Sequence, residues 1–163
     1  MQYTLSILVE NHAGVLSKIS GLFSRRGFNI DSLAVGVTAD PNVSRITIVA
    51  NGDEYVVEQL EKQLNKVIPV IKVKRLKEGE FISRELILIK VHCAAYKRAE
   101  IVKTAEIMQA KIVDAAPSCV TVEYCETAAR IKTLIDMLKP YGIREIVRTG
   151  TIAIDRGNTA VSI

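Results

Sequence analysis

The stretch YTLSILVENHAGVLSKISGLF, residues 3–23, contains the change of periodicity that decides the fold. Its first seven residues alternate between two faces, which predicts a β-strand over residues 3–9. From Val15 onward the apolar residues recur at helical spacing, which predicts an amphipathic helix that ends near Gly27. The residues between, 10–14, include a carboxylate, an amide, an imidazole and a glycine. They could form a catalytic loop, a ligand-binding loop or a plain turn.

The same two periods continue along the chain and reveal an internal repeat. The first copy continues with a strand at 28–37 that has a bulge near Asp31–Ser32, a turn at 38–42, a strand at 43–50, a helix around 56–64 and a strand at 68–76. The second copy has strands at 84–92, 110–116, 119–125 and 143–154, with helices around 101–108 and 131–138. Each copy therefore has the order strand, helix, strand, strand, helix, strand.

This βαββαβ order is that of the ferredoxin-like fold. Right-handed crossovers place both helices of such a unit on one face of an antiparallel sheet. The sequence thus predicts an α+β protein with two tandem ferredoxin-like domains. We expect a first domain at 1–76, a linker at 77–83, a second domain at 84–156 and a loose tail at 157–163. Each sheet has free edges, so we also expect a homodimer or a larger assembly.

Alternation in the first copy is imperfect. Leu8, Val49 and Ile71 are apolar residues on the face that should be polar. Such a pattern is expected when both faces of a sheet are partly buried.

Composition indicates a soluble globular protein, since 48% of the 163 residues are hydrophobic and 25% are charged. The chain contains no run of about 18 apolar residues, so no membrane span is predicted. The first residues indicate a strand rather than a signal peptide. Cys93, Cys119 and Cys125 lack the spacing of a disulfide framework or a zinc site. We therefore expect no metal, no membrane association and a cytoplasmic location.

The net charge of +4 requires nucleic acid to be considered as a partner. However, the basic residues are spread along the chain, and the densest run, KVKRLK at 72–77, falls where a strand meets the linker. Aromatic residues that could stack on bases are few, with five tyrosines, three phenylalanines and no tryptophan. A solvated basic linker explains this run, and no nucleic-acid binding is predicted.

Catalysis by this chain has little support in its residues. A general base needs a partner, and a nucleophile needs an adjacent base. The only histidines, His12 and His92, lie in corresponding regions of different copies. No HExxH, GxSxG or P-loop pattern occurs. We predict no catalytic residue.

Two interpretations of the opening loop remain. In the first it is a plain turn, in which Gly14 supplies an unusual backbone angle and Asn11 caps the helix. In the second it binds a ligand, because free N–H groups at a helix start attract a carboxylate. Asn11 offers a donor and an acceptor to a zwitterion, Gly14 allows close approach, and Asn29 could reach the same end of the unit. This combination suits a small amino acid.

Particular motifs resemble a known family. The segment VENHAGVLSKISGLFSRRGFNIDSL (9–33) resembles the signature of the ACT domain, an amino-acid-binding ferredoxin-like module. DPNVSRITIV (40–49) and VEQLEKQLNKVIPVIKV (57–73) resemble the small, regulatory subunits of acetolactate synthase, also called acetohydroxyacid synthase. RELILIKV (84–91) and AKIVDAAPSCVTVEYCE (110–126) resemble the second domain of that family.

The resemblance implies a non-catalytic subunit that activates a separate catalytic subunit, in which thiamine diphosphate, Mg²⁺ and FAD are expected. It also implies feedback inhibition of branched-chain amino acid biosynthesis, usually by valine, bound where two ACT units meet. The effector-binding residues implied by the matching motif and its loop are Asn11, His12, Ala13, Gly14, Val15, Leu16, Asn29 and Ile30. The second copy reads VHCAAYKRAEIV at this place and lacks the Asn-x-x-Gly pattern, so no equivalent site is expected there. The alternative is a stand-alone amino-acid sensor of another enzyme, and the branched-chain effector itself is left open.

Overall fold

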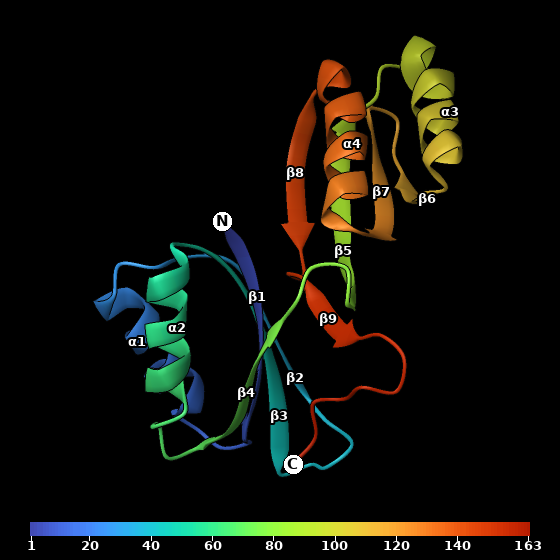
Figure 1. The fold of residues 1–163 in the computed structure, drawn as a ribbon. Coiled ribbons are helices and arrows are strands. Elements are labelled where there is room, and N and C mark those ends of the chain that lie inside the picture. Colours follow the sequence, from blue (N-terminus) through green and yellow to red (C-terminus); the bar gives the residue numbers. More distant parts are fainter. The chain divides into compact units, whose positions relative to one another are not determined.

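The structure is a computed structural model that describes residues 1–163 as two compact units (Figure 1). The first unit comprises residues 1–82 together with 151–163, and the second comprises residues 83–150. The chain therefore leaves the first unit once and returns to it once.

The first unit contains an antiparallel sheet with the strand order β2-β3-β1-β4. Figure 1 shows α1 and α2 on the same face of this sheet. Its elements are β1 (Gln2–Glu10), α1 (Val15–Arg25), β2 (Asn29–Val37), β3 (Val43–Asn51), α2 (Glu54–Leu64), β4 (Val70–Leu76) and, from the end of the chain, β9 (Ile152–Asp155).

The second unit repeats the arrangement with the strand order β6-β7-β5-β8. Figure 1 shows α3 and α4 together on one face of this sheet. Its elements are β5 (Phe81–His92), the 3₁₀ turn η1 (Ala95–Lys97), α3 (Arg98–Met108), β6 (Lys111–Ala115), β7 (Cys119–Glu126), α4 (Ala128–Leu138), the 3₁₀ turn η2 (Lys139–Tyr141) and β8 (Ile143–Arg148).

The predicted α+β fold with two ferredoxin-like units is confirmed. The bulge expected near Asp31 is also present, because the pairing of β2 with β3 shifts register between Ile30 and Ser32. Asp31 is the additional residue at this shift, which interrupts the alternation that the sequence shows there.

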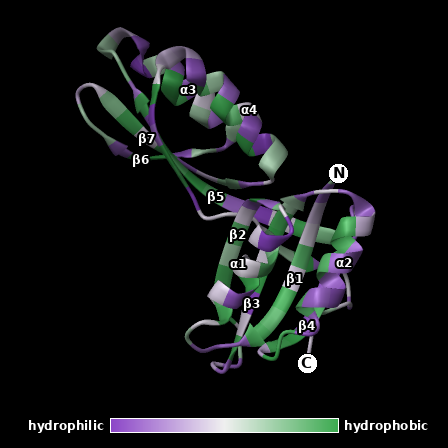
Figure 2. Ribbon diagram, turned by 90° about the vertical axis from the view of Figure 1, so that its left-hand side faces the viewer, coloured by the Kyte–Doolittle hydropathy of each residue, from purple (hydrophilic) through white to green (hydrophobic).

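Each unit has its own apolar core between the sheet and its helices. In the first unit Ile7 and Ile48 of the central strands pack with Ile19 and Phe23 of α1 and are at most 1% exposed. In the second unit the core residues of β5 and β7 pack on Ile131 of α4. Figure 2 shows the corresponding hydrophobic colouring along β1 and β3 and more hydrophilic residues on α2.

The opposite face of the first sheet is also buried, which explains the imperfect alternation of its strands. Ser6 and Leu8 of β1 are 0% and 3% exposed although they point away from the helices. Leu8 forms a small apolar cluster with Val43 and Val161. The expectation that residues 157–163 form a loose tail is therefore wrong, because this segment covers the sheet.

The expected strand at 143–154 is also wrong, because it is two strands. Both pair with β5, but β9 belongs by its contacts to the first unit. β8 ends at Arg148 and β9 begins at Ile152, with Gly150 between them at a φ of 84°. A residue with a side chain rarely adopts this angle, so the glycine permits the turn. Isoleucine, valine and threonine, which are typical of strands, occur on both sides of the break and conceal it.

Polar contacts hold the returning segment on the first unit. The Thr151 N–H donates to the Ser32 hydroxyl at 2.6 Å, and the Arg156 N–H donates to the Glu80 carbonyl at 2.9 Å. Lys74 forms an ion pair with Asp155 at 2.9 Å. Residues 151–163 are thus fixed at several points along their length, and we call them the C-terminal segment.

We predict that Val161→Ala loosens the C-terminal segment, because Val161 is only 8% exposed and supplies its apolar anchor. Amide hydrogen exchange over residues 156–163 should become at least several-fold faster. The matched control is Ile163→Ala, since Ile163 is 79% exposed and should leave the exchange almost unchanged. Equal effects of the two substitutions would contradict the anchoring role of Val161.

Candidate functional site

The loop between β1 and α1 is tied to the turn between β2 and β3. The Asn11 backbone N–H donates to the Asn42 carbonyl at 2.8 Å, and its side-chain Nδ2 donates to the Pro41 carbonyl at 2.9 Å. Asn11 therefore does not cap α1, contrary to the plain-turn interpretation. Its Oδ1 accepts no hydrogen bond within the chain.

Gly14 sets the backbone at the start of α1. It occupies the N-cap position with a φ of 87°, in the left-handed region that favours glycine. A Cβ atom at this position would meet no other atom within 4 Å, so the space beside the Gly14 backbone is open. The glycine thus provides both an unusual angle and access to the backbone.

The N-terminus of α1 has no internal compensation for its charge. No side chain caps it, and its first turn contains no acidic residue. The free N–H groups of such a helix start carry a partial positive charge that favours an anion. Val15 is buried beneath this end, whereas Leu16 is 42% exposed and offers an apolar surface next to it.

His12 is held within the loop by both ring nitrogens. Nε2 lies 2.8 Å from Glu10 Oε2, and Nδ1 lies 3.2 Å from the Ala13 carbonyl. The hydrogen bond to Glu10, followed by that to Ala13, raises the pKa of His12 above its ordinary value of 6.5. These contacts give His12 a role in holding the loop.

The start of β2 holds a polar cluster that the sequence did not indicate. Three amide side chains, those of Gln2, Asn29 and Asn51, donate to the Asp31 carboxylate. The Asn29 bond is 3.3 Å long and leaves Asn29 Oδ1 free to accept. The only sequence signal was the interrupted alternation at Asp31, which predicted the bulge but not its partners.

The two predicted parts of the site lie at opposite ends of the sheet. Asn29 pairs with Asn51, which pairs with Gln2 at the beginning of β1, whereas the loop follows Glu10 at its end. With a rise of about 3.3 Å per residue, these ends of β1 are about 26 Å apart. The expectation that Asn29 reaches the loop within one unit is therefore wrong. The structure brings Asn11 to Leu16 together and keeps Asn29 and Ile30 away from them.

The corresponding loop of the second unit is built differently. Residues 95–97 form a 3₁₀ turn, and no glycine precedes α3. Arg98 takes the bridging role of Asn11, because its Nη2 donates to the Ala116 carbonyl at 2.7 Å and the Pro117 carbonyl at 3.1 Å. The backbone at this helix start has no left-handed residue.

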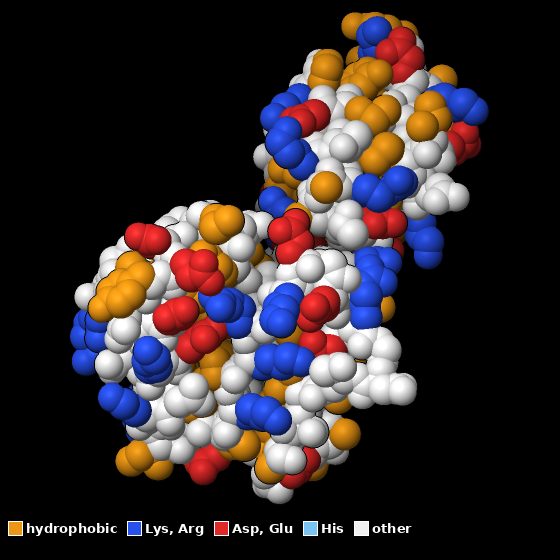
Figure 3. Space-filling model, in the orientation of Figure 1, with side chains coloured by type: hydrophobic (Ala, Val, Ile, Leu, Met, Phe, Trp, Pro, Cys, Tyr) orange, Lys and Arg blue, Asp and Glu red, His pale blue; other side chains and the backbone are white.

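Other kinds of site find little support. No group of three or more His, Cys, Asp or Glu side chains could hold a metal ion. No helix has both the length and the apolar character needed to cross a membrane. On the face of the first unit shown in Figure 3, acidic and basic side chains are interspersed, without the broad basic area that nucleic acid requires.

We predict that His12 titrates above pH 6.5 and that Glu10→Gln lowers its pKa towards this value. Because the pKa is raised in the folded state, the stabilisation from this pair is fully present below pH 6.5 and is lost as pH rises through the raised pKa. Proton NMR titration of the His12 ring measures this directly, with Glu58→Gln as a control outside the loop. An unchanged His12 pKa in Glu10→Gln would disprove the pairing.

Comparisons with known proteins agree with this geometry. Residues 5–72 match the model of an AHAS small subunit-like ACT domain, and residues 84–157 match that of the small subunit of acetolactate synthase.

Individual relatives agree over nearly the whole chain. The chain is 48% identical to a probable acetolactate synthase small subunit of Archaeoglobus fulgidus, covering 97% of this chain and 99% of the relative. It is 40% identical to the small subunit of acetolactate synthase isozyme 3 of Escherichia coli, over 97% of this chain and 98% of the relative. The crystal structure of the small subunit from Thermotoga maritima superimposes with a TM-score of 0.89 at 35% identity, covering 98% and 99%. The resemblance seen in the sequence is confirmed, and the chain belongs to the family of acetolactate synthase small subunits.

Proposed function

We propose that this chain is the regulatory subunit of an acetolactate synthase, which activates the catalytic subunit and confers inhibition by valine or another branched-chain amino acid. The observation that carries the proposal is the match to small subunits over 97% of the chain. Thiamine diphosphate, Mg²⁺ and FAD would be bound by the catalytic subunit. Three free cysteines are consistent with a cytoplasmic assembly.

The geometry of the loop supports recognition of an amino acid. Its carboxylate would meet the free N–H groups of α1 beside Gly14, where space is open and the helix end is electropositive. Its ammonium needs oxygen acceptors, and Asn11 and Asn29 each have a free Oδ1. Its alkyl group would pack on Leu16, which is partly exposed, and on Ile30.

One chain cannot supply both asparagines to one ligand, because they lie about 26 Å apart along the sheet. A second chain resolves this. β2 is an edge strand, and Val35 and Val37 on it are 49% and 60% exposed. Antiparallel pairing of β2 with its copy in the partner would place the Asn29 end of one strand beside the Val37 end of the other. The Val37 end is where Asn11 binds the turn at 38–42.

This homodimer would contain two equivalent effector sites, each built from the loop of one chain and the β2 start of the other. Ligand binding would then stabilise one geometry of the paired sheets, and the catalytic subunit would sense that geometry. A coupling of about 1–3 kcal/mol between effector and partner is sufficient for substantial inhibition. Valine, leucine and isoleucine differ by about one methylene, which is worth about 1–3 kcal/mol in an apolar pocket.

The function is tested by reconstitution with the catalytic subunit of the same cell and by calorimetric titration with the three branched-chain amino acids. We expect increased acetolactate formation and saturable binding of at least one amino acid. Binding without any effect on acetolactate formation would instead support a stand-alone sensor.

We predict that Gly14→Asp removes amino-acid binding and inhibition but retains the fold and the activation. Aspartate tolerates the left-handed backbone at a cost of about 1–2 kcal/mol, and its carboxylate would occupy the place of the ligand carboxylate. The control is Gly21→Ala in the middle of α1, which has open space around it and should add about 1 kcal/mol of stability without affecting binding. Normal binding by Gly14→Asp would refute the site.

We predict that Val35→Lys converts the dimer to monomers, because a lysine on an edge strand opposes pairing with another strand. Light scattering would show half the molar mass, and effector binding would be lost because the site requires two chains. The matched control is Val113→Lys on β6, an edge strand of the second unit where Val113 is 50% exposed. A dimeric Val35→Lys protein would exclude pairing through β2.

A further inference from the structure

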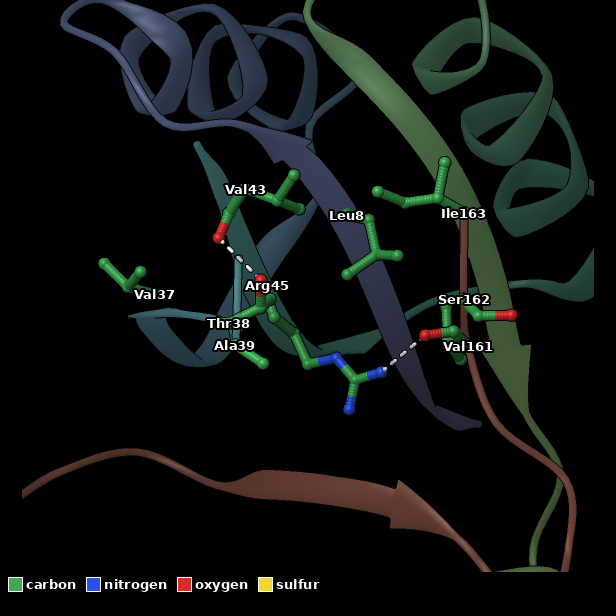
Figure 4. A pocket seen from close by; sticks show the side chains of 9 residues that line it. All are labelled: Leu8, Val37, Thr38, Ala39, Val43, Arg45, Val161, Ser162 and Ile163. Carbon is green, nitrogen blue, oxygen red and sulfur yellow. Dashed lines mark hydrogen bonds between the residues drawn. The ribbon is translucent and has the colours of Figure 1, made fainter. Parts of the chain in front are cut away.

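A pocket of the first unit, separate from the proposed amino-acid site, lies on the sheet face opposite the helices. It is formed between the β2–β3 hairpin and the C-terminal segment (Figure 4). Its volume is about 510 Å³. Aliphatic side chains form most of its wall, including Leu8, Val37, Val43 and Val161. It shares no residue with the proposed amino-acid site. Of its lining residues, Val37 also lies on the edge strand that the proposed dimer uses.

Arg45 supplies the only charged side chain of this pocket. One of its terminal nitrogens donates to the Val161 carbonyl at 3.3 Å, as Figure 4 shows. Its Nε is buried and has no hydrogen-bond partner. Arg45 belongs to none of the ion pairs of the chain, so its charge is not neutralised. A buried cationic donor without an acceptor is costly, and an anion would satisfy it.

The neighbouring cation strengthens this electropositive character. Arg45 and Lys72 are the two cross-strand neighbours of Leu8. Lys72 also binds only a neutral group, the Ser162 carbonyl, at 2.9 Å. Two cations therefore flank an apolar floor, and no Asp or Glu side chain lines the pocket, although Ile163 with its terminal carboxylate is part of the wall. The hydroxyl of Thr38 in the pocket wall already donates to the Val43 carbonyl at 2.9 Å.

We propose that this pocket binds a small aliphatic carboxylate, with its carboxylate on the Arg45 guanidinium and its alkyl group against Leu8, Val43 and Val161. An amino acid suits the pocket less well, because no acidic side chain lines it to receive an ammonium. A phosphorylated ligand suits it less well because the wall is mainly aliphatic. The pocket is thus a second site that takes an acid without an amino group.

The ligand would also act on the C-terminal segment. Arg45 on β3 and Val161 at the end of the chain are on two sides of the same pocket. A bound carboxylate would contact both and hold the segment to the sheet. Binding should therefore slow amide exchange over residues 159–163, a change that an exposed surface ion would not cause.

The test is calorimetric titration of the full chain with 4-methylpentanoate, an aliphatic acid that lacks an ammonium, and with the neutral 4-methylpentanamide. We expect saturable binding of the acid with a dissociation constant of about 1 mM or below, and no binding of the amide. Arg45→Met, which keeps an unbranched apolar stem and loses the guanidinium charge, should weaken binding roughly tenfold or more. Arg84→Met, outside the pocket, is the matched control.

Two further variants make the result decisive. Ala39→Glu places a carboxylate at the exposed rim of the pocket, outside the edge strand β2, and should weaken binding even if Arg45→Met does not fold. Gly14→Asp should bind the acid normally, since it alters only the amino-acid site. Absence of saturable binding by the wild-type chain, unchanged binding by Ala39→Glu or folded Arg45→Met, or loss of binding in Gly14→Asp would each overturn the proposal. Failure of the amino-acid site alone would leave the acid binding intact.

Discussion

Burial of strand β1 on both faces is the constraint on which the first unit depends. Leu5, Ile7 and Val9 face the helices, whereas Thr4, Ser6 and Leu8 face the other way and are also buried. The helices α1 and α2 can cover only one of these faces. The other face contains hydroxyl groups and cations, and a polar, extended segment suits it better than a third helix. The C-terminal segment meets this need with one apolar anchor and several polar contacts.

The order of elements could be predicted because strand and helix periods are encoded locally. The residues 3–9 and 15–23 each show their period without any tertiary information, and the same holds for the second copy. The bulge at Asp31 was also visible, since an additional residue reverses the alternation. The polar cluster around Asp31 was not, because Gln2 and Asn51 reach it through strand register. Register is a property of the assembled sheet.

The predictions that were wrong also concern properties of the assembled sheet that the local sequence does not show. Residues 143–154 are rich in strand-forming residues on both sides of Gly150, and only this glycine indicates the break between β8 and β9. The segment after β9 has few apolar residues and looks unstructured until its partners on the sheet are known. Asn29 is close to the loop in sequence, yet a helix of 11 residues takes the chain to the other end of the sheet between them. The glycine at the start of α1 could be predicted because Gly14 and the helix start form a local motif. Their role in effector binding stays a prediction.

The path of the chain has a consequence for its modular character. The first unit is completed only after the second has been made, since residues 151–163 belong to it. The second unit is therefore an insertion within the first. The chain passes between the two units at two points, 82–83 and 150–151. A cut at the linker would not release the first unit intact, because it would leave one face of β1 without its cover. To remove the second unit without damage to the first, residue 82 would have to be joined to residue 151. The remaining chain would then keep the C-terminal segment that covers β1.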